Sequence, residues 1–197
     1  MVAITAAEVF AGLRFAEGNR WTGPTVTFSI PGAGAVWSEF AYGPTKEPFN
    51  ADYGVLNAAQ RTGFLDALRA WDQLIALDLV EAPDGATSQG VIRIAFTDVN
   101  DYASASTTAY AYTPPPTGFR TEGFNGDIWL DDAYKAAAPL PGTFLYETLL
   151  HEIGHALGLK HPFEGAALPA AFNNTRYTVM AYSEFTDSSV TGLTPLK

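Results

Sequence analysis

All three histidines of this 197-residue chain lie in one short stretch, His151 to His161, which reads HEIGHALGLKH. In a helix of 3.6 residues per turn, His151 and His155 lie one turn apart on one face and can bind the same metal ion. Gly158 favours the left-handed conformation that ends a helix, so the chain can turn and bring His161 back as a third ligand. Three neutral imidazoles leave one tetrahedral position open, which indicates a catalytic zinc ion rather than a structural one.

Glu152 follows the first histidine and lies about 100° round the helix axis from it. A carboxylate at that position can reach a metal-bound water without being a ligand itself. Zinc lowers the pKa of such a water toward ~7 and polarises a carbonyl group, so we expect Glu152 to take the proton and pass one to a leaving amine. The alternative is an ordinary amphipathic helix with surface histidines, and the offsets of Gly158 and His161 argue against it.

The extended histidine motif resembles that of the metzincin metalloproteases, in which a methionine-containing turn follows. The stretch from Tyr177 to Ser183, which reads YTVMAYS, looks like that turn. The His161-Pro162 pair and the Met-Ala-Tyr run that begins at Met180 are similar to the serralysin branch of bacterial secreted proteases. The resemblance implies that Met180 forms an apolar floor beneath zinc and that Tyr182 reaches the zinc or the oxyanion of the transition state. On composition alone, Met180 would be a core residue and Tyr182 a half-buried aromatic.

A second segment, Ala109, Tyr110, Ala111 and Tyr112, resembles the edge strand of that family, which lies above the active-site cleft and runs antiparallel to the substrate. Pairing with the backbone of an extended peptide suits a protease that accepts many sequences, because every residue supplies the same hydrogen-bonding groups. The alternative is a plain exposed strand or loop.

The composition fits a folded domain with no nucleic acid or anionic membrane as partner. Apolar residues make up 47% of the chain and charged residues 16%, and the formal net charge is -10. Cysteine is absent, which excludes disulfides, a thiol nucleophile and a cysteine that would silence the zinc. The N-terminus has neither the basic region nor the apolar region of a signal peptide, and no apolar run is long enough to span a membrane.

Several elements must position these residues. Hydrophobic periodicity and capping signals predict helices over residues 5–17, 57–75 and 144–157, and strands over 25–30, 77–80, 91–96 and 126–130. The Gly- and Pro-rich segment 31–52 is expected to be an irregular surface excursion. Asp127, Asp131 and Asp132 do not have the spacing of a calcium-binding EF-hand loop, and we expect them to be solvated surface carboxylates.

Together these features predict an α+β, metzincin-like protease domain over residues 1–197, with a twisted mixed sheet, a long zinc-site helix and a Met-turn. Two subdomains are expected, an upper one over about 1–158 and a lower one over about 159–197. The calcium-binding repeats that normally follow the domain in serralysins are absent from this sequence, so Ca²⁺ is expected only through those repeats.

The resemblance implies a zinc-dependent endopeptidase that cleaves extended proteins or peptides and binds one catalytic Zn²⁺ and no other cofactor. It also implies a bacterial protein exported without a signal peptide, and a proteinaceous inhibitor or a propeptide stays open as a further partner. Two other functions stay open: a zinc-binding but inactive peptide-recognition module, and a metal-dependent hydrolase acting on other substrates.

Overall fold

The computed structural model describes residues 3–16, 18–104, 106–119 and 123–185. Within these ranges, five strands form one mixed sheet in the order β2-β1-β3-β5-β4. The strands are β1 (Thr25–Ser29), β2 (Asp78–Glu81), β3 (Ile92–Thr97), β4 (Ala109–Ala111) and β5 (Ile128–Asp131). Neighbouring strands are parallel except for β4, which pairs antiparallel with β5. The expected α+β class with a mixed sheet is therefore confirmed.

Four α-helices lie within the described ranges; three follow the predicted positions with shifted ends, and the one over residues 39–42 was not predicted. They are α1 (Ala6–Leu13), α2 (Glu39–Tyr42), α3 (Ala58–Asp72) and α4 (Phe144–Ala156), with single 3-10 turns η1 (Glu47–Phe49), η2 (Val99–Asp101), η3 (Asp132–Tyr134) and η4 (Ala170–Phe172). Both predicted capping boxes form, Thr5 with Glu8 and Asn57 with Gln60. The first helix ends earlier than predicted, because Arg14 is extended and forms an isolated bridge with Leu159.

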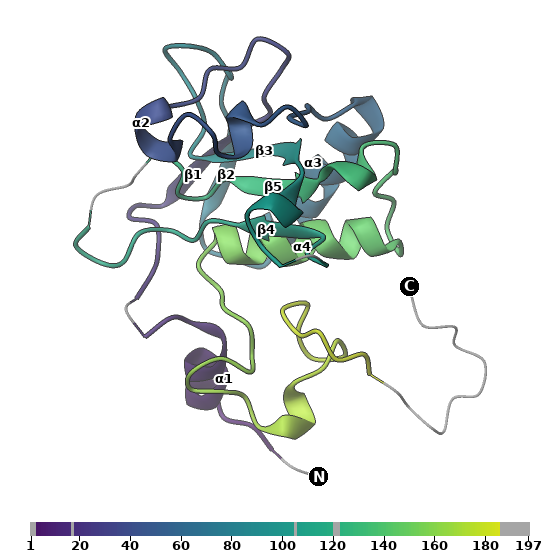
Figure 1. Ribbon diagram of the computed structural model, residues 1–197. Coiled ribbons are helices and arrows are strands. Elements are labelled where there is room, and N and C mark those ends of the chain that lie inside the picture. The colour runs from purple at the N-terminus through teal and green to yellow at the C-terminus, as the bar shows by residue number, and fades with distance from the viewer. Residues whose placement is uncertain (1–2, 17, 105, 120–122, 186–197) are drawn as a thin grey trace.

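One face of the sheet is covered by α3 and α4 (Figure 1). Side chains alternate between the two faces along each strand, so Ile92, Ile94 and Phe96 of β3 all point to the helical face, where each is fully buried. They pack with aliphatic and aromatic side chains of the two helices, among them Phe64 of α3 and Ile153 of α4. Full burial of each such side chain contributes roughly 1.5–3 kcal/mol, which makes this face the main hydrophobic core.

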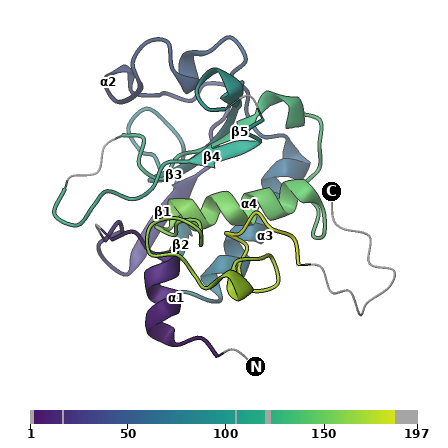
Figure 2. The same ribbon diagram turned by 60° about the horizontal axis from the view of Figure 1, so that its bottom comes forward.

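The opposite face is covered by α2 and irregular chain (Figures 1 and 2). We call its core the aromatic cluster, and it comprises Trp37, Tyr42, Ala95, Val99 and Trp129, with Tyr53, Tyr110, Tyr112 and Phe124 among the residues packed around it. The prediction that segment 31–52 is a surface excursion is therefore wrong. Its aromatic side chains need the buried Trp129 of β5 as a partner, and this contact between distant residues leaves no periodic signal in the sequence.

The aromatic face also buries charged groups. Arg93 is bonded through two nitrogens to Asp84 (2.8 and 2.9 Å), and both side chains are 4% exposed. Asp127 is 1% exposed and accepts a hydrogen bond from the hydroxyl of Tyr42. Asp131 is 5% exposed, so the prediction that Asp127 and Asp131 are solvated is wrong, because irregular chain covers their ends of the sheet. Asp132 is half-buried and lies near Lys135.

Below the sheet, α1 lies beside the chain that follows α4 (Figure 2). The buried Lys160 joins the two segments, because its ammonium group donates to the carbonyls of Gly12 (2.7 Å) and Glu164 (2.6 Å). The N–H of Lys160 also donates to the carbonyl of Leu13 (2.9 Å). Among the helices of the described ranges, none is long and apolar enough to cross a membrane.

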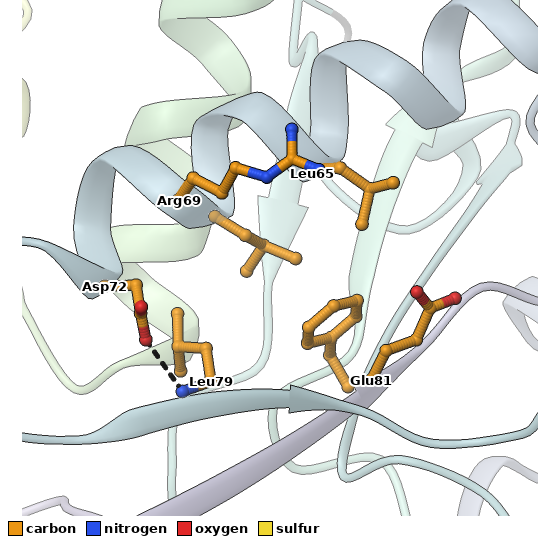
Figure 3. A pocket seen from close by; sticks show the side chains of 7 residues that line it. Leu65, Arg69, Asp72, Leu79 and Glu81 are labelled. Atoms are coloured by element: carbon orange, nitrogen blue, oxygen red, sulfur yellow. Dashed lines mark hydrogen bonds between the residues drawn. The ribbon is translucent and has the colours of Figure 1, made fainter.

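At the far edge of the sheet from β4, a pocket of about 240 Å³ opens between α3 and strands β1 and β2 (Figure 3). Its charged groups already have partners. The Asp72 carboxylate accepts from the N–H of Leu79 (2.9 Å), and Glu81 pairs with Arg61 (2.5 Å). These bonds hold β2 against α3.

Candidate metal centre

The helix that carries two of the three histidines is fixed by its cap and by its buried face. The side chain of Thr143 accepts a hydrogen bond from the N–H of Tyr146 (3.3 Å) and caps the first turn of α4. Leu145, Leu149 and Ile153 recur at four-residue spacing and are at most 4% exposed. This packing orients His151 and His155 toward the segment that follows the helix.

Gly158 ends α4 and turns the chain. Its φ is 101°, a region that favours glycine, and a Cβ atom there would lie 2.6 Å from the carbonyl oxygen of Asn19. The N–H of Leu159 donates to the carbonyl of Gly154 and the N–H of Gly158 to that of His155, both at 2.9 Å. This pair of bonds is a Schellman motif, and it directs the next residues back toward the helix.

The three imidazoles meet at their Nε2 atoms. Nε2 of His151 lies 3.1 Å from those of His155 and His161, and the last two are 3.0 Å apart. Each Nδ1 has its own oxygen at 2.8 Å: the carbonyl of Val179 for His151, the carbonyl of Leu159 for His155, and Oε1 of Glu164 for His161.

These partners determine the tautomer of each ring. A neutral imidazole carries one N–H, and an acceptor beside Nδ1 assigns the hydrogen there, which leaves a lone pair on Nε2. The close Nε2 contacts are therefore not hydrogen bonds, since three lone pairs point at one place. A cation between them removes this repulsion, and the three histidines are a group that could hold a metal ion.

The spacing fits zinc. In a tetrahedral site with zinc–nitrogen bonds of about 2.0–2.1 Å, two ligand nitrogens are about 3.3 Å apart. The observed separations of 3.0 and 3.1 Å are close to this value. Burial lowers the pKa of His151 and lowers that of His155 to about 3, so both rings are neutral at pH 7, as metal binding requires.

Glu152 lies beside this group and is 5% exposed. Its Oε2 has no hydrogen-bond partner in the part of the chain that the structure describes. Burial raises the pKa of this carboxyl group to about 8. A buried carboxyl group with a free oxygen can accept and release a proton near neutral pH.

Tyr182 reaches the metal centre from the segment after η4. Its hydroxyl lies 2.7 Å from Nε2 of His161, and its ring is stacked on that of His151 with 5.5 Å between centroids. Burial raises the pKa of Tyr182, and the charges of Glu152 and Glu164 raise it further, so the hydroxyl stays protonated at neutral pH. The residue is nonetheless two-thirds exposed, so it lies at the surface beside the three imidazoles.

Met180 is fully buried and lies against α4 at Gly154. A Cβ atom on Gly154 would lie 2.5 Å from the Met180 sulfur and 3.2 Å from the ring of Trp71. Gly154 therefore makes room for Met180, a role that the sequence analysis did not identify. A lone glycine in a helical pattern gives no signal of what packs on it.

Glu164 and Phe163 were also missed. Besides its bond to Nδ1, the Glu164 carboxylate accepts from the backbone N–H of His161 (3.3 Å). The Phe163 ring lies parallel to the His161 ring, with 5.0 Å between centroids and 5° between planes. An acidic residue three positions after a predicted ligand is the signal that could have suggested Glu164, because carboxylates commonly orient metal-binding histidines.

The predicted edge strand lies at the end of the sheet and packs on α4. The backbone N–H of Asp131 donates to the carbonyl of Thr108, and the backbone N–H of Tyr112 donates to the carbonyl of Asp127, both at 2.9 Å. Because bonded residues alternate in an antiparallel pair, the backbone groups of Ala109 and Ala111 point to the open edge.

A helix with two imidazoles, a third imidazole beyond a glycine turn and a methionine packed below are the features of a metzincin metallopeptidase. Comparison with known proteins confirms this class. Residues 47–187 match the family model described as Matrixin, so the chain belongs to the matrixin family of zinc-dependent metallopeptidases.

Individual relatives come from two groups. The chain is 28% identical to serralysin of Proteus mirabilis over 189 residues (84% of this chain, 36% of the relative). It is 29% identical to serralysin A of Dickeya chrysanthemi over 131 residues (64% and 27%), and 30% identical to stromelysin-1 of Mus musculus over 106 residues (52% and 21%). The chain thus spans between 21% and 36% of the length of these curated relatives.

Proposed function

We propose that this chain is a zinc-dependent endopeptidase that hydrolyses peptide bonds in extended protein substrates. The observation that carries the proposal is the convergence of three Nε2 lone pairs, each with its Nδ1 held by a separate oxygen. In this assignment His151, His155 and His161 are the zinc ligands. Zinc, when bound, acidifies a water molecule and polarises the carbonyl group of the scissile bond.

Glu152 is the general base. Its unpartnered Oε2 takes the proton of the attacking water, and the resulting acid gives a proton to the leaving amine. Its buried surroundings favour this exchange, because they raise the pKa of the carboxyl group into the neutral range. Tyr182 donates its hydroxyl hydrogen to the substrate oxygen as negative charge develops there. Met180 supports the helix by packing against Gly154, the residue before the second ligand.

The substrate lies along the open edge of β4. An extended peptide bonds to the backbone groups of Ala109 and Ala111, whose small side chains point toward α4. This pairing holds the peptide beside the helix that carries Glu152, whatever its side chains. Recognition through backbone groups predicts cleavage of unfolded or extended proteins rather than of folded ones.

We propose a two-part domain as well, with the division at about residue 158, and an exported bacterial protein of the serralysin branch. The similarity to two bacterial serralysins supports the branch. Because α1 packs on the chain after α4, this helix would lie with the lower part.

Metal content measured beside cleavage of casein tests the proposed activity. We expect one zinc ion per chain, and we expect Glu152→Ala to keep the zinc and to lose roughly 10²–10⁴-fold in cleavage rate. Glu147→Ala, on the same helix, is the matched control and should keep both properties. Unchanged hydrolysis by zinc-loaded Glu152→Ala would sink the proposal, and zinc without cleavage in the unmodified chain would favour a peptide-recognition module.

A further inference from the structure

A single buried carboxylate holds both tyrosines of the edge strand. Glu47 is 1% exposed, and its Oε1 accepts hydrogen bonds from the hydroxyls of Tyr110 (2.5 Å) and Tyr112. Burial raises the pKa of both tyrosines, and the bonds to Glu47 raise it further, so both hydroxyls remain donors at every physiological pH. Two hydrogen bonds to a carboxylate oxygen are stronger than bonds between neutral groups.

Glu47 belongs to a segment whose backbone is held by the middle of the sheet, although its side chain bonds the tyrosines of the edge strand. It stands on η1, which contacts β3. A few residues later, Gly54 exchanges two backbone hydrogen bonds with Phe96 of β3 (3.0 and 2.8 Å). The carboxylate therefore connects β4 to β3 by a route that does not pass through β5.

The edge strand needs such a connection, because its other restraints are few. β4 is three residues long and, among the strands of the described ranges, pairs with β5 alone. Its side chains on the helical face are the methyl groups of Ala109 and Ala111, which give little lateral packing. On the other face, the rings of Tyr110 and Tyr112 are 5.8 Å apart at 85° and enter the aromatic cluster.

We propose that Glu47 is a positioning residue for substrate. Through the hydroxyls of Tyr110 and Tyr112 it fixes the position and register of β4 in the sheet. It thereby fixes the backbone groups of Ala109 and Ala111 that point to the open edge. Glu47 acts on the bound peptide through the strand and does not touch it. This role rests on the proposed function, in which an extended peptide pairs with β4.

The test separates long substrates from short ones. A short blocked peptide spans the scissile bond without lying along β4, whereas a longer extended peptide with the same scissile bond can pair with the strand. For Tyr110→Phe/Tyr112→Phe, we expect KM for the long peptide to rise roughly tenfold, the effect of losing about one charge-assisted hydrogen bond. The kcat values, the KM for the short peptide and the zinc content should not change.

Two further variants make the test specific. Glu47→Ala should reproduce the rise in KM, and Glu47→Gln, which keeps an acceptor oxygen, should restore most of the loss. The matched control is Tyr53→Phe. It removes a hydroxyl of the same aromatic cluster whose hydrogen bond comes from Trp37 (3.2 Å), a residue outside β4. It should leave both KM values unchanged.

Three results overturn the inference: an unchanged KM for the long peptide, an equal loss for both peptides, or a loss of zinc. The last two would indicate a merely structural role. If the unmodified zinc-loaded chain cleaves neither peptide, the proposed function fails instead. Binding of the long peptide, followed by fluorescence anisotropy, then decides, since weaker binding by the double tyrosine variant supports the inference and equal binding rejects it.

Discussion

The two faces of the sheet are covered in different ways. On one face, regular helices bring aliphatic side chains onto the strands, and α4 also carries His151 and His155. On the other face, irregular chain supplies aromatic rings together with buried charged and hydroxyl groups, among them Arg93, Asp84 and Glu47. The helical face depends on hydrophobic area, whereas the aromatic face depends also on hydrogen bonds and an ion pair between buried polar groups. The helical histidines and the contacts of Glu47 thus lie on opposite sides of one sheet.

The largest expected effect comes from breaking an ion pair on the aromatic face. Arg93→Met leaves Asp84 buried without its cation and also removes the contact with the Trp37 ring, 3.7 Å from the guanidinium. We expect a loss of about 3–5 kcal/mol in the free energy of unfolding. Urea denaturation of the zinc-loaded protein measures it. Arg69→Met, at an exposed pair with Asp66, should cost at most about 1 kcal/mol. Similar losses at both sites would show that burial does not make the Arg93–Asp84 pair more important than an exposed one.

The next prediction tests how tightly Met180 packs against α4. Gly154→Ala places a methyl group where the Met180 sulfur lies, and overpacking of this kind costs roughly 1–3 kcal/mol. Alanine is otherwise favoured over glycine inside a helix by about 1 kcal/mol, so a net stabilisation would show that Met180 moves freely. Thermal denaturation decides the sign. Adding Met180→Ala should remove the clash and recover part of the loss.

The third prediction concerns the carboxylate that holds the ligand outside the helix. Glu164→Gln weakens the partner of His161 Nδ1 and should lower zinc affinity by about 10–100-fold with little change in fold. Competition with a zinc-binding dye measures the affinity. Glu39→Gln, at an exposed carboxylate on α2, is the control. Equal affinities in the two variants would show that Glu164 does not orient the ligand.

The last prediction is the pH dependence of the zinc-free protein, for which the two faces have opposite signs. The lowered pKa values of His151 and His155 mean that the unfolded chain binds more protons between about pH 3 and 6.5, so stability falls as pH falls through this range. Burial raises the pKa of Asp127, so the stability it contributes below about pH 3.9 is lost as pH rises above that value.

Stability curves in a chelator, measured across pH, test these signs. Asp127→Asn keeps an acceptor for the Tyr42 hydroxyl and removes the buried acid. It should therefore gain stability relative to the unmodified chain as pH rises above about 4. A gap that narrows with rising pH would show that Asp127 is stabilised as a carboxylate.

The helical face and the ligand set were predictable because their signals are local. Residues three and four apart in a helix share a face, which relates His151 to His155 and Leu149 to Ile153 without any knowledge of the rest of the fold. The alternation of strands and helices likewise gave most element positions, with end shifts of a few residues.

The aromatic face was not predictable, because its partners are far apart in the chain. Glu47 and Tyr110 are separated by 63 positions, and Tyr42 and Asp127 by 85. No periodic pattern connects such residues, and a carboxylate in a Pro-rich segment or after a glycine reads as solvated. The contact between Gly154 and Met180 could not be predicted for the same reason.

The Lys160 contacts have a consequence for how the chain acquires its fold. The bond from its ammonium group to the Gly12 carbonyl spans 148 positions, and it lies next to the last metal ligand in the sequence. Contacts between such distant residues form slowly, because a large loop must close before they contribute. We therefore expect α1 to dock only after the segment around Lys160 has been synthesised, so the metal centre should form late in folding.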